Sequence, residues 1–247
     1  MKLAGKSAIV TGAGRDIGAA TALKLASEGA RVAINYFASS AGADEVVSKI
    51  KANGGDAFAL QGDLTQQEAV NALVNATVEN FGGIDILVNN AGGLVARKTV
   101  ADSTLEHWKY VMDLNLTSNF MMTNACLAHM KSGAIVNLAS QAARDGGGPG
   151  SVPYATSKGA IMTLTRGLAK ELGPNIRVNG LCPGMIDTDF HNIHTPDAGR
   201  RGFEAAAPMK RQGVVEDVAN LVLFLACDDS AFITGSNIDL NGGMLFS

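Results

Sequence analysis

Short apolar runs alternate with longer segments of helical periodicity along most of the chain, and this alternation constrains the fold more than any other feature. We expect strands at 7–10, 31–36, 57–60, 86–88, 134–139, 177–181 and 237–240. Helices are predicted between them, one ending at Gly29 and others over 39–53, 65–81, 104–130, 154–172 and 215–226. Strand and helix alternating at this spacing predict an α/β doubly wound parallel sheet, with right-handed crossovers and helices on both faces.

Local signals support these boundaries. Thr65 to Glu68 and Ser103 to Glu106 each have the pattern of a capping box, in which the first and fourth side chains satisfy free N–H groups at a helix start. Glycine pairs at 54–55 and 82–83 stop two of the predicted helices.

Composition limits the organisation and the class of partner. A chain of 247 residues with 47% hydrophobic content suits a single domain spanning residues 1–247. A formal net charge of -3 without a basic run predicts no nucleic-acid partner and no anionic membrane surface. We find no membrane span or signal-peptide core, so we expect a cytoplasmic protein. Cys126, Cys182 and Cys227 lie far apart and read as core residues rather than a disulfide framework.

A glycine-rich turn joins the first predicted strand to the first helix, over Thr11 to Gly18. Glycines let the backbone approach a phosphate, and the free N–H groups and dipole of the next helix stabilise its charge. The first βα junction is also where dinucleotide-binding folds place the pyrophosphate. This turn is therefore a candidate phosphate site.

Tyr154 and Lys158 are the most chemically suggestive pair in the chain. Four residues apart on a helix, they share one face, and a nearby ammonium lowers the pKa of a phenol toward a useful range for proton transfer. Ser140 follows an apolar strand and emerges at its carboxyl edge, where open α/β sheets bind ligands. Such a hydroxyl could polarise a substrate oxygen, although a Tyr–Lys pair alone is commonly a surface pair.

Two further segments are candidates for function. Asparagines and glycines follow the 86–88 strand. They either let a ligand ring pack closely against the backbone or form an ordinary turn. Asn115 lies among apolar residues of the next predicted helix. Residues 184–213 form a long segment at the ligand edge, which predicts a substrate lid. His191 and His194 lie in it, but two imidazoles without supporting ligands do not predict a metal site.

Taken together, Thr11, Gly12 and Gly18, the Asn89–Gly92 segment, Asn115, Ser140, Tyr154 and Lys158 resemble the classical short-chain dehydrogenase/reductase family. The similarity covers essentially the whole chain and is greatest to the 3-oxoacyl-acyl-carrier-protein reductase group. It implies a single Rossmann-type domain and hydride transfer between a nicotinamide and a carbonyl.

The resemblance also implies residue roles. Tyr154 would be the acid/base, Lys158 would lower its pKa and hold the ribose, Ser140 would orient the carbonyl, and Asn115 would support a water relay. The residues implied to bind the cofactor are Gly12, Gly14, Arg15, Asp16, Ile17, Asn35, Tyr36, Ser39, Ser40, Asp63, Leu64, Asn90, Ala91, Gly92, Tyr154, Lys158, Pro183, Gly184, Ile186 and Thr188.

Two departures from the family pattern stand out. Asp16 occupies a position where the family usually has glycine, and we expect its carboxylate to cap the following helix rather than face a phosphate. The loop from Ser140 to Tyr154 is one residue longer than the commonest spacing, which its glycines can absorb.

The region after the second strand predicts the cofactor. An acidic residue about twenty positions past the glycine motif would bind the adenosine ribose and repel a 2′-phosphate. Here the first acid is Asp44, well into the next helix. Arg15 could instead bind a 2′-phosphate, with Asn35, Ser39 and Ser40 as neutral donors. NADP is therefore predicted over NAD, the alternative being that Arg15 is a solvated loop residue.

The substrate remains open at the level of sequence. A 3-oxoacyl thioester, possibly carrier-bound, competes with a sugar, polyol or other secondary alcohol, because the lid decides the substrate. A catalytically silent nucleotide sensor is a third reading, which the intact catalytic set opposes. Helices 104–130 and 154–172 carry apolar residues on more than one face, which predicts a partner copy, and the resemblance implies a homotetramer.

Overall fold

The structure is a computed structural model that describes all residues from Met1 to Ser247. Its centre is one seven-stranded sheet in which every neighbouring pair of strands is parallel, in the order β3-β2-β1-β4-β5-β6-β7. The strands are β1 (Ser7–Val10), β2 (Arg31–Tyr36), β3 (Ala57–Gln61), β4 (Ile86–Asn89), β5 (Gly133–Leu138), β6 (Ile176–Pro183) and β7 (Asn237–Leu240). This confirms the predicted doubly wound sheet, whose order reverses between β1 and β4.

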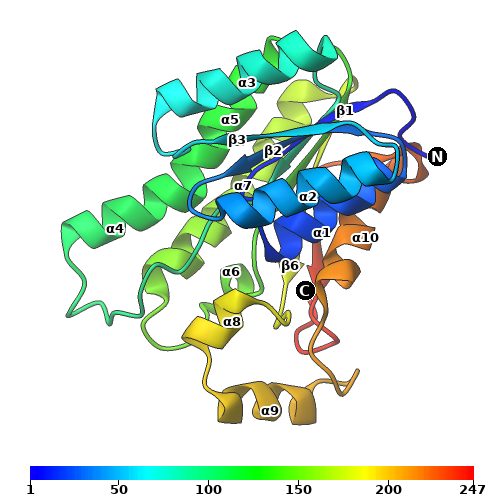
Figure 1. Cartoon of the computed structure of the whole chain (residues 1–247). Helices are drawn as coiled ribbons and strands as arrows, with labels where there is room; N and C mark the ends of the chain where they lie inside the picture. The colour runs from blue at the N-terminus through cyan, green and yellow to red at the C-terminus, as the bar shows by residue number, and fades with distance from the viewer.

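Helices cover both faces of the sheet (Figure 1). One face carries α1 (Asp16–Ser27), α2 (Ser40–Ala52) and α10 (Val215–Ala226). The other carries α3 (Gln67–Phe81), α5 (Ser118–Leu127) and α7 (Val152–Leu172). Alternate strand residues enter the two layers: Val10 packs with Leu25 in the first, and Ile9 packs with Leu73 in the second. Strands buried on both sides explain why they appear as continuous apolar runs in the sequence.

The helix predicted over 104–130 is interrupted. It consists of α4 (Leu105–Met112), a π-helical turn η1 (Asp113–Thr117) and then α5, which ends at Leu127. A π-helical turn inserts one residue into the helical register and often occurs at functional sites. Asn115 lies inside this turn, and its residue is 1% exposed.

Both predicted capping boxes are wrong in detail. The Thr65 hydroxyl donates to Asp63 in a local turn, and α3 begins only at Gln67. Before α4 the cap is Thr104 rather than Ser103, because the Thr104 side chain accepts the N–H of His107.

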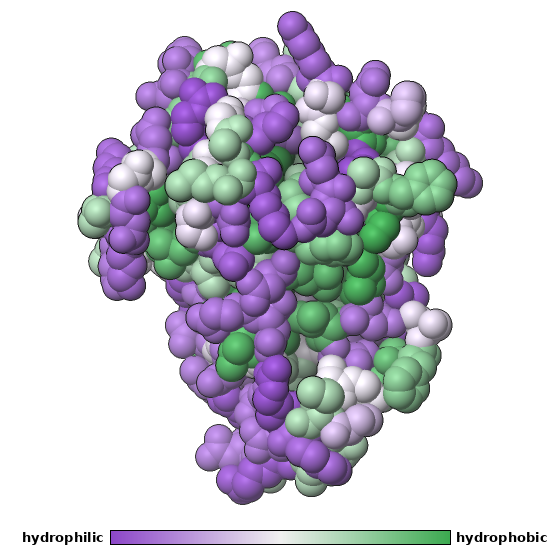
Figure 2. Space-filling view, turned by 90° about the vertical axis from the view of Figure 1, so that its right-hand side faces the viewer, coloured by the Kyte–Doolittle hydropathy of each residue, from purple (hydrophilic) through white to green (hydrophobic).

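Several short helices were not predicted. They are α6 (Ala142–Asp145), α8 (Asp189–His194), α9 (Asp197–Ala206) and the 3₁₀ turn η2 (Asp228–Ser230). Figure 1 shows α8 and α9 together at one end of the molecule, beyond the carboxyl end of β6. Seen from the side in Figure 2, the surface is mainly hydrophilic, with apolar residues gathered in a band above this end. None of the helices combines the length and apolarity needed to cross a bilayer.

Candidate active site

A cavity of about 690 Å³ opens where the carboxyl ends of the central strands meet. Its wall brings together twelve of the predicted cofactor residues, namely Gly12, Arg15, Asp16, Ile17, Asn90, Gly92, Tyr154, Lys158, Pro183, Gly184, Ile186 and Thr188. Ser140 lines it as well. Ligands of open α/β sheets bind at this edge, beside the point where strand order reverses.

The turn after β1 has the geometry of a phosphate loop. Gly12 has a φ of +63°, and a Cβ at Gly18 would lie 2.4 Å from the Gly12 carbonyl oxygen. Neither position accommodates a side chain without displacement of the backbone. The Asn90 side chain donates to the carbonyls of Thr11 and Gly12, at 2.8 and 3.1 Å, and so fixes this turn from the β4 side.

Thr11 has a structural role beside the cavity that the sequence did not reveal. Its hydroxyl accepts the N–H groups of Asn90 and Ala91, both at 2.9 Å. The first turn and the segment after β4 are therefore held as one unit around the cavity.

Asp16 does not cap α1 as expected. Its backbone is left-handed, with a φ of +50°, which explains why glycine suits this position. The carboxylate accepts the N–H of Asp189, at 3.3 Å, rather than an N–H of its own helix. Burial raises the pKa of this carboxyl above its ordinary value, and the Asp189 N–H opposes that rise. Asp16 also lines the cavity, so an acidic side chain lies beside the candidate phosphate site.

We expect Asp16→Asn to tighten NADPH binding about three- to tenfold, because the substitution removes a negative charge beside the phosphates. Asparagine tolerates left-handed backbone, so the fold should be retained. Fluorescence titration with NADPH measures the change, and Asp16→Gly should give a similar gain if charge is its cause. An unchanged dissociation constant in Asp16→Asn would contradict this explanation.

Arg15 also contacts the segment that follows β6. Its guanidinium lies 3.0 Å from the Asp189 carboxylate, and both side chains are about half exposed, at 53% and 55%. The expected reach of Arg15 toward the end of β2 is therefore not the arrangement seen here. The pair links the first turn to the start of α8.

Eight predicted cofactor residues lie outside the cavity wall: Gly14, Asn35, Tyr36, Ser39, Ser40, Asp63, Leu64 and Ala91. The Asn35 side chain is already hydrogen-bonded within the protein, since it accepts the Gly12 N–H and donates to the Gly62 carbonyl. It is therefore unsuited to the donor role predicted for it. Gly14 packs directly against the start of α2, because a Cβ there would lie 2.7 Å from the Ser39 carbonyl oxygen.

Tyr154, on α7, faces the cavity together with Ser140. Burial raises the pKa of the Tyr154 phenol, and the Ser140 hydroxyl partly lowers it. The direction is opposite to the one expected from Lys158. A phenol with a raised pKa keeps its proton at neutral pH, so Tyr154 is protonated in this arrangement.

Lys158 is buried, with its residue 5% exposed. Its ammonium donates to the Leu138 carbonyl at 2.6 Å and lies 5.8 Å from the centre of the Tyr154 ring. Burial lowers the pKa of Lys158 to about 8. The cation is therefore anchored to the end of β5 rather than bonded to the phenol.

Asn115 does not line the cavity. Its side chain accepts the Gly93 N–H and donates to the carbonyls of Gly93 and Val111, all at 2.9 Å. A Cβ at Gly92 would lie 2.5 Å from Asn115 Oδ1 and 3.3 Å from Lys158 Nζ. Asn115 therefore shapes the backbone beside Lys158, and only glycine fits between them.

The outer wall comes from residues that the sequence did not single out. Phe190 of α8 lies 5.8 Å from the Tyr154 ring, measured between centroids. The Arg97 guanidinium donates to the carbonyls of His194 and Pro149, both at 3.0 Å, and so joins two loops to the end of α8 at the mouth. Only the tertiary fold brings these residues together.

The two histidines of α8 pack around Phe190, with ring centroids 5.1 and 5.2 Å away. Burial, reinforced by the positive charge of Arg200 and Arg97, lowers the pKa of His191 to about 4. His191 is therefore neutral near pH 7. No group of three or more metal-ligating side chains occurs in the structure.

The glycine turn, the close approach at Gly92 and the cavity between them fit an extended dinucleotide. Comparison with known proteins agrees with a dinucleotide-binding site. The family model described as Enoyl-(Acyl carrier protein) reductase matches residues 12–245. The chain belongs to the short-chain dehydrogenase/reductase family. It is an NAD(P)-dependent oxidoreductase.

Individual members of the family are similar over nearly their full length. A 3-oxoacyl-acyl-carrier-protein reductase from Synechocystis sp. is 41% identical, and the match covers 98% of each chain. A short chain dehydrogenase from Burkholderia cenocepacia, solved in complex with NADP, is 37% identical with a TM-score of 0.93 over 99% of each chain. A blue fluorescent protein from a metagenomic library, in complex with NADPH, is 34% identical with a TM-score of 0.93 over 100% of each.

Proposed function

We propose that this short-chain dehydrogenase/reductase is an NADPH-dependent carbonyl reductase acting on 3-oxoacyl thioesters. The observation that carries the proposal is the convergence of Ser140, Tyr154 and Lys158 on one cavity whose other end is the glycine turn. Similarity to a 3-oxoacyl-acyl-carrier-protein reductase supports the substrate class. The apolar cavity residues Leu94, Leu114 and Phe190 suit an acyl chain.

Each side chain has a distinct task in this proposal. A reduced nicotinamide supplies a hydride when bound. The Ser140 hydroxyl orients the substrate carbonyl toward Tyr154, and the Tyr154 hydroxyl donates its proton to that oxygen. Lys158 places a positive charge beside the phenolate left behind and offers its remaining N–H donors to the ribose. Asn115 holds the Gly92–Gly93 backbone in shape beside Lys158.

An absorbance assay of NADPH oxidation at 340 nm tests the substrate class. We expect acetoacetyl thioesters to be turned over with a higher kcat/KM than diketones, quinones or keto sugars. Preference for a keto sugar would favour a polyol or sugar dehydrogenase instead. Absence of turnover with every carbonyl in the panel, despite NADPH binding, would favour a nucleotide sensor.

The proposed preference for NADPH rests on the missing acid after β2 and on Arg15. Related structures that hold NADP or NADPH support it. Arg15 must exchange Asp189 for the 2′-phosphate, so Arg15→Ala should raise the KM for NADPH about tenfold and leave that for NADH nearly unchanged. Arg201→Ala, at an exposed position on α9, is the matched control. Equal effects on both cofactors would contradict this role.

We further propose that residues 184–213 act as a substrate lid on the single domain 1–247. The base of the segment is closed by a parallel bridge between Ile186 and Gly213, and α8 and α9 project beyond it. Phe190 brings this segment to Tyr154.

A homotetramer is also part of the proposal. Phe120 on α5 is 54% exposed and Leu105 on α4 is 60% exposed, while Met122 of α5 is buried against the sheet. A helix apolar on two sides requires a second partner. Light scattering at micromolar concentration checks the mass, and a monomer would contradict the assembly.

A further inference from the structure

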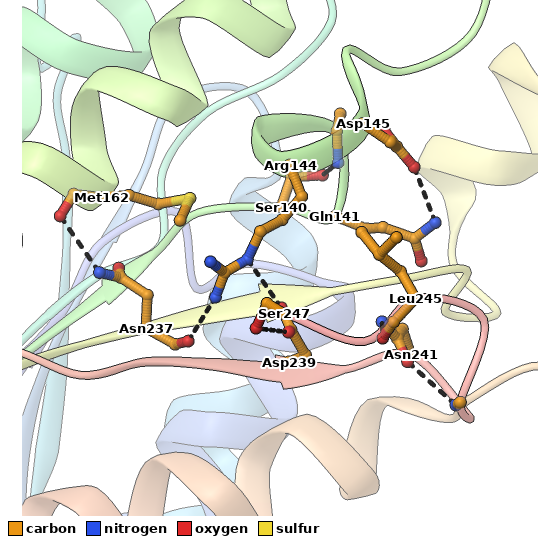
Figure 3. A network of polar contacts seen from close by, with 12 residues as sticks. Ser140, Gln141, Arg144, Asp145, Met162, Asn237, Asp239, Asn241, Leu245 and Ser247 are labelled. Carbon is orange, nitrogen blue, oxygen red and sulfur yellow. Dashed lines mark hydrogen bonds and ion pairs between the residues drawn. The ribbon is translucent and has the colours of Figure 1, made fainter.

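A mostly buried ion pair connects the turn after Ser140 to the edge strand of the sheet (Figure 3). The Nε of Arg144 donates to Asp239 Oδ1 at 3.1 Å, and its Nη2 donates to the Asn237 carbonyl at 2.7 Å. The two side chains are 17% and 15% exposed, whereas those of the Lys2–Asp229 pair are each 49% exposed. Because the guanidinium is planar, its two bonds fix the orientation of the Arg144 side chain as well as its distance from β7.

The helix that carries Arg144 needs such an anchor. α6 has four residues, none of them fully buried, and two glycines with positive φ, Gly146 and Gly147, follow it. A single turn is too short to stabilise itself, because fixing the first turn of a helix costs more than its one hydrogen bond returns. The Gln141 N–H donates to the Pro183 carbonyl of β6 at 2.8 Å, and Ala143 packs against buried residues, so the turn is held beside β6 and α7. The Arg144 pair adds a directed contact that reaches further, to the edge strand β7.

Ser140 is built into the start of the same turn. Its hydroxyl accepts the Ala142 N–H at 3.2 Å, and its carbonyl accepts the Ala143 N–H at 3.0 Å. The Arg144 N–H in turn donates to the Gln141 carbonyl at 2.8 Å. A shift of α6 would therefore redirect the Ser140 hydroxyl.

The strand that receives Arg144 also holds the helix of Tyr154. Asn237 accepts from Arg144 through its carbonyl, and its side chain donates to the Met162 carbonyl of α7 at 3.1 Å. Asp239, the carboxylate partner, additionally accepts from the Ser247 hydroxyl. Strand β7 therefore contacts both the turn after Ser140 and the helix α7, and so relates their positions to each other.

From these contacts we propose that Arg144 and Asp239 are positioning residues, which set the Ser140 hydroxyl at the correct place relative to Tyr154. Neither is a catalytic residue, because each acts through α6. The inference rests on the role of Ser140 in the proposed function. The edge strand β7, which lies outside the cavity wall formed by β5 and β6, would thus help to align the Ser140 hydroxyl with Tyr154.

A double-mutant cycle on kcat tests the proposal, with an acetoacetyl thioester and saturating NADPH. We expect Arg144→Met to lower kcat about tenfold while the NADPH dissociation constant, measured by fluorescence, changes less than twofold. In the Ser140→Ala background the same substitution should have no further effect on kcat, since the hydroxyl it positions is gone. Arg211→Met, which removes a different arginine–aspartate pair, is the matched control.

The outcomes separate the two claims. If Arg144→Met lowers kcat equally with and without Ser140, the positioning role is wrong while the proposed function stands. If Ser140→Ala alone retains full kcat, the proposed role of Ser140 fails, and the positioning role fails with it. Arg144→Lys should recover part of the loss. Should Arg144→Met not fold, Asp239→Asn, expected to lower kcat about threefold, gives the same cycle.

Discussion

Replacing Tyr154 by phenylalanine is expected to lower kcat about 10²- to 10⁴-fold, the range that general acid catalysis contributes. The substitution removes the proton donor but keeps the ring that lies 5.8 Å from Phe190. NADPH binding, followed by fluorescence, should therefore change little. The measurement is steady-state NADPH oxidation with the best carbonyl substrate.

Tyr110→Phe is the matched control for this variant. Tyr110 also lines the cavity, but it is 45% exposed and lies on α4. Tyr110 has no part in the proposed proton transfer, so loss of its hydroxyl should change kcat less than about threefold. Near-normal turnover in Tyr154→Phe would remove the basis of the proposed proton transfer.

Replacing Lys158 by methionine is expected to weaken both turnover and cofactor binding. Bonds from a charged donor contribute about 1.5–3 kcal/mol each, which corresponds to roughly ten- to a hundredfold. We expect the NADPH dissociation constant to rise at least tenfold and kcat/KM to fall about a hundredfold. Lys170→Met, at an exposed position on the same helix, controls for the loss of a lysine from α7.

The pH dependence of folding stability, compared between wild type and Lys158→Met, tests the lowered pKa of Lys158. Burial lowers the pKa of Lys158 to about 8, whereas the unfolded chain has the ordinary value of 10.5. Between these values the unfolded state binds the proton that the folded state has lost, so this group makes stability rise with pH. Urea unfolding of the apoprotein should show wild type gaining on Lys158→Met from pH 8 to 10.5. A constant difference across that window would contradict the lowered pKa.

The regular framework was predictable because parallel strands buried on both faces leave continuous apolar runs. β1 and β2, which are such strands, have the predicted bounds. The half-buried edge strand β7 and the helix α10 have them as well. The π-helical turn at Asp113–Thr117 was not predictable, because its residues follow helical periodicity and only packing selects the wider turn. The single-turn helices α6 and α8 were missed for a related reason, since tertiary contacts rather than propensity stabilise them.

For the candidate site, sequence located the strand ends but not the side-chain partners. Tyr154 and Lys158 share a helical face as predicted, yet the ammonium bonds to Leu138, a contact that depends on how α7 crosses β5. Asn35 was predicted to be a neutral donor to the 2′-phosphate, whereas the fold buries its side chain beneath the first turn. The orientation of Asp16 likewise depends on Asp189, 173 residues away in the chain.

Under the proposed role of Arg15 in binding the 2′-phosphate, its contact with Asp189 makes the affinities of cofactor and substrate depend on each other. A phosphate that attracts the guanidinium competes with a carboxylate at the start of α8, so occupancy at one end of the cavity alters the freedom of the segment at the other. Coupling of this kind is reciprocal: a substrate that displaces α8 changes cofactor affinity by the factor that the cofactor changes substrate affinity. Because an exposed ion pair contributes about 0–1 kcal/mol, the coupling amounts to fivefold at most and declines as ionic strength rises.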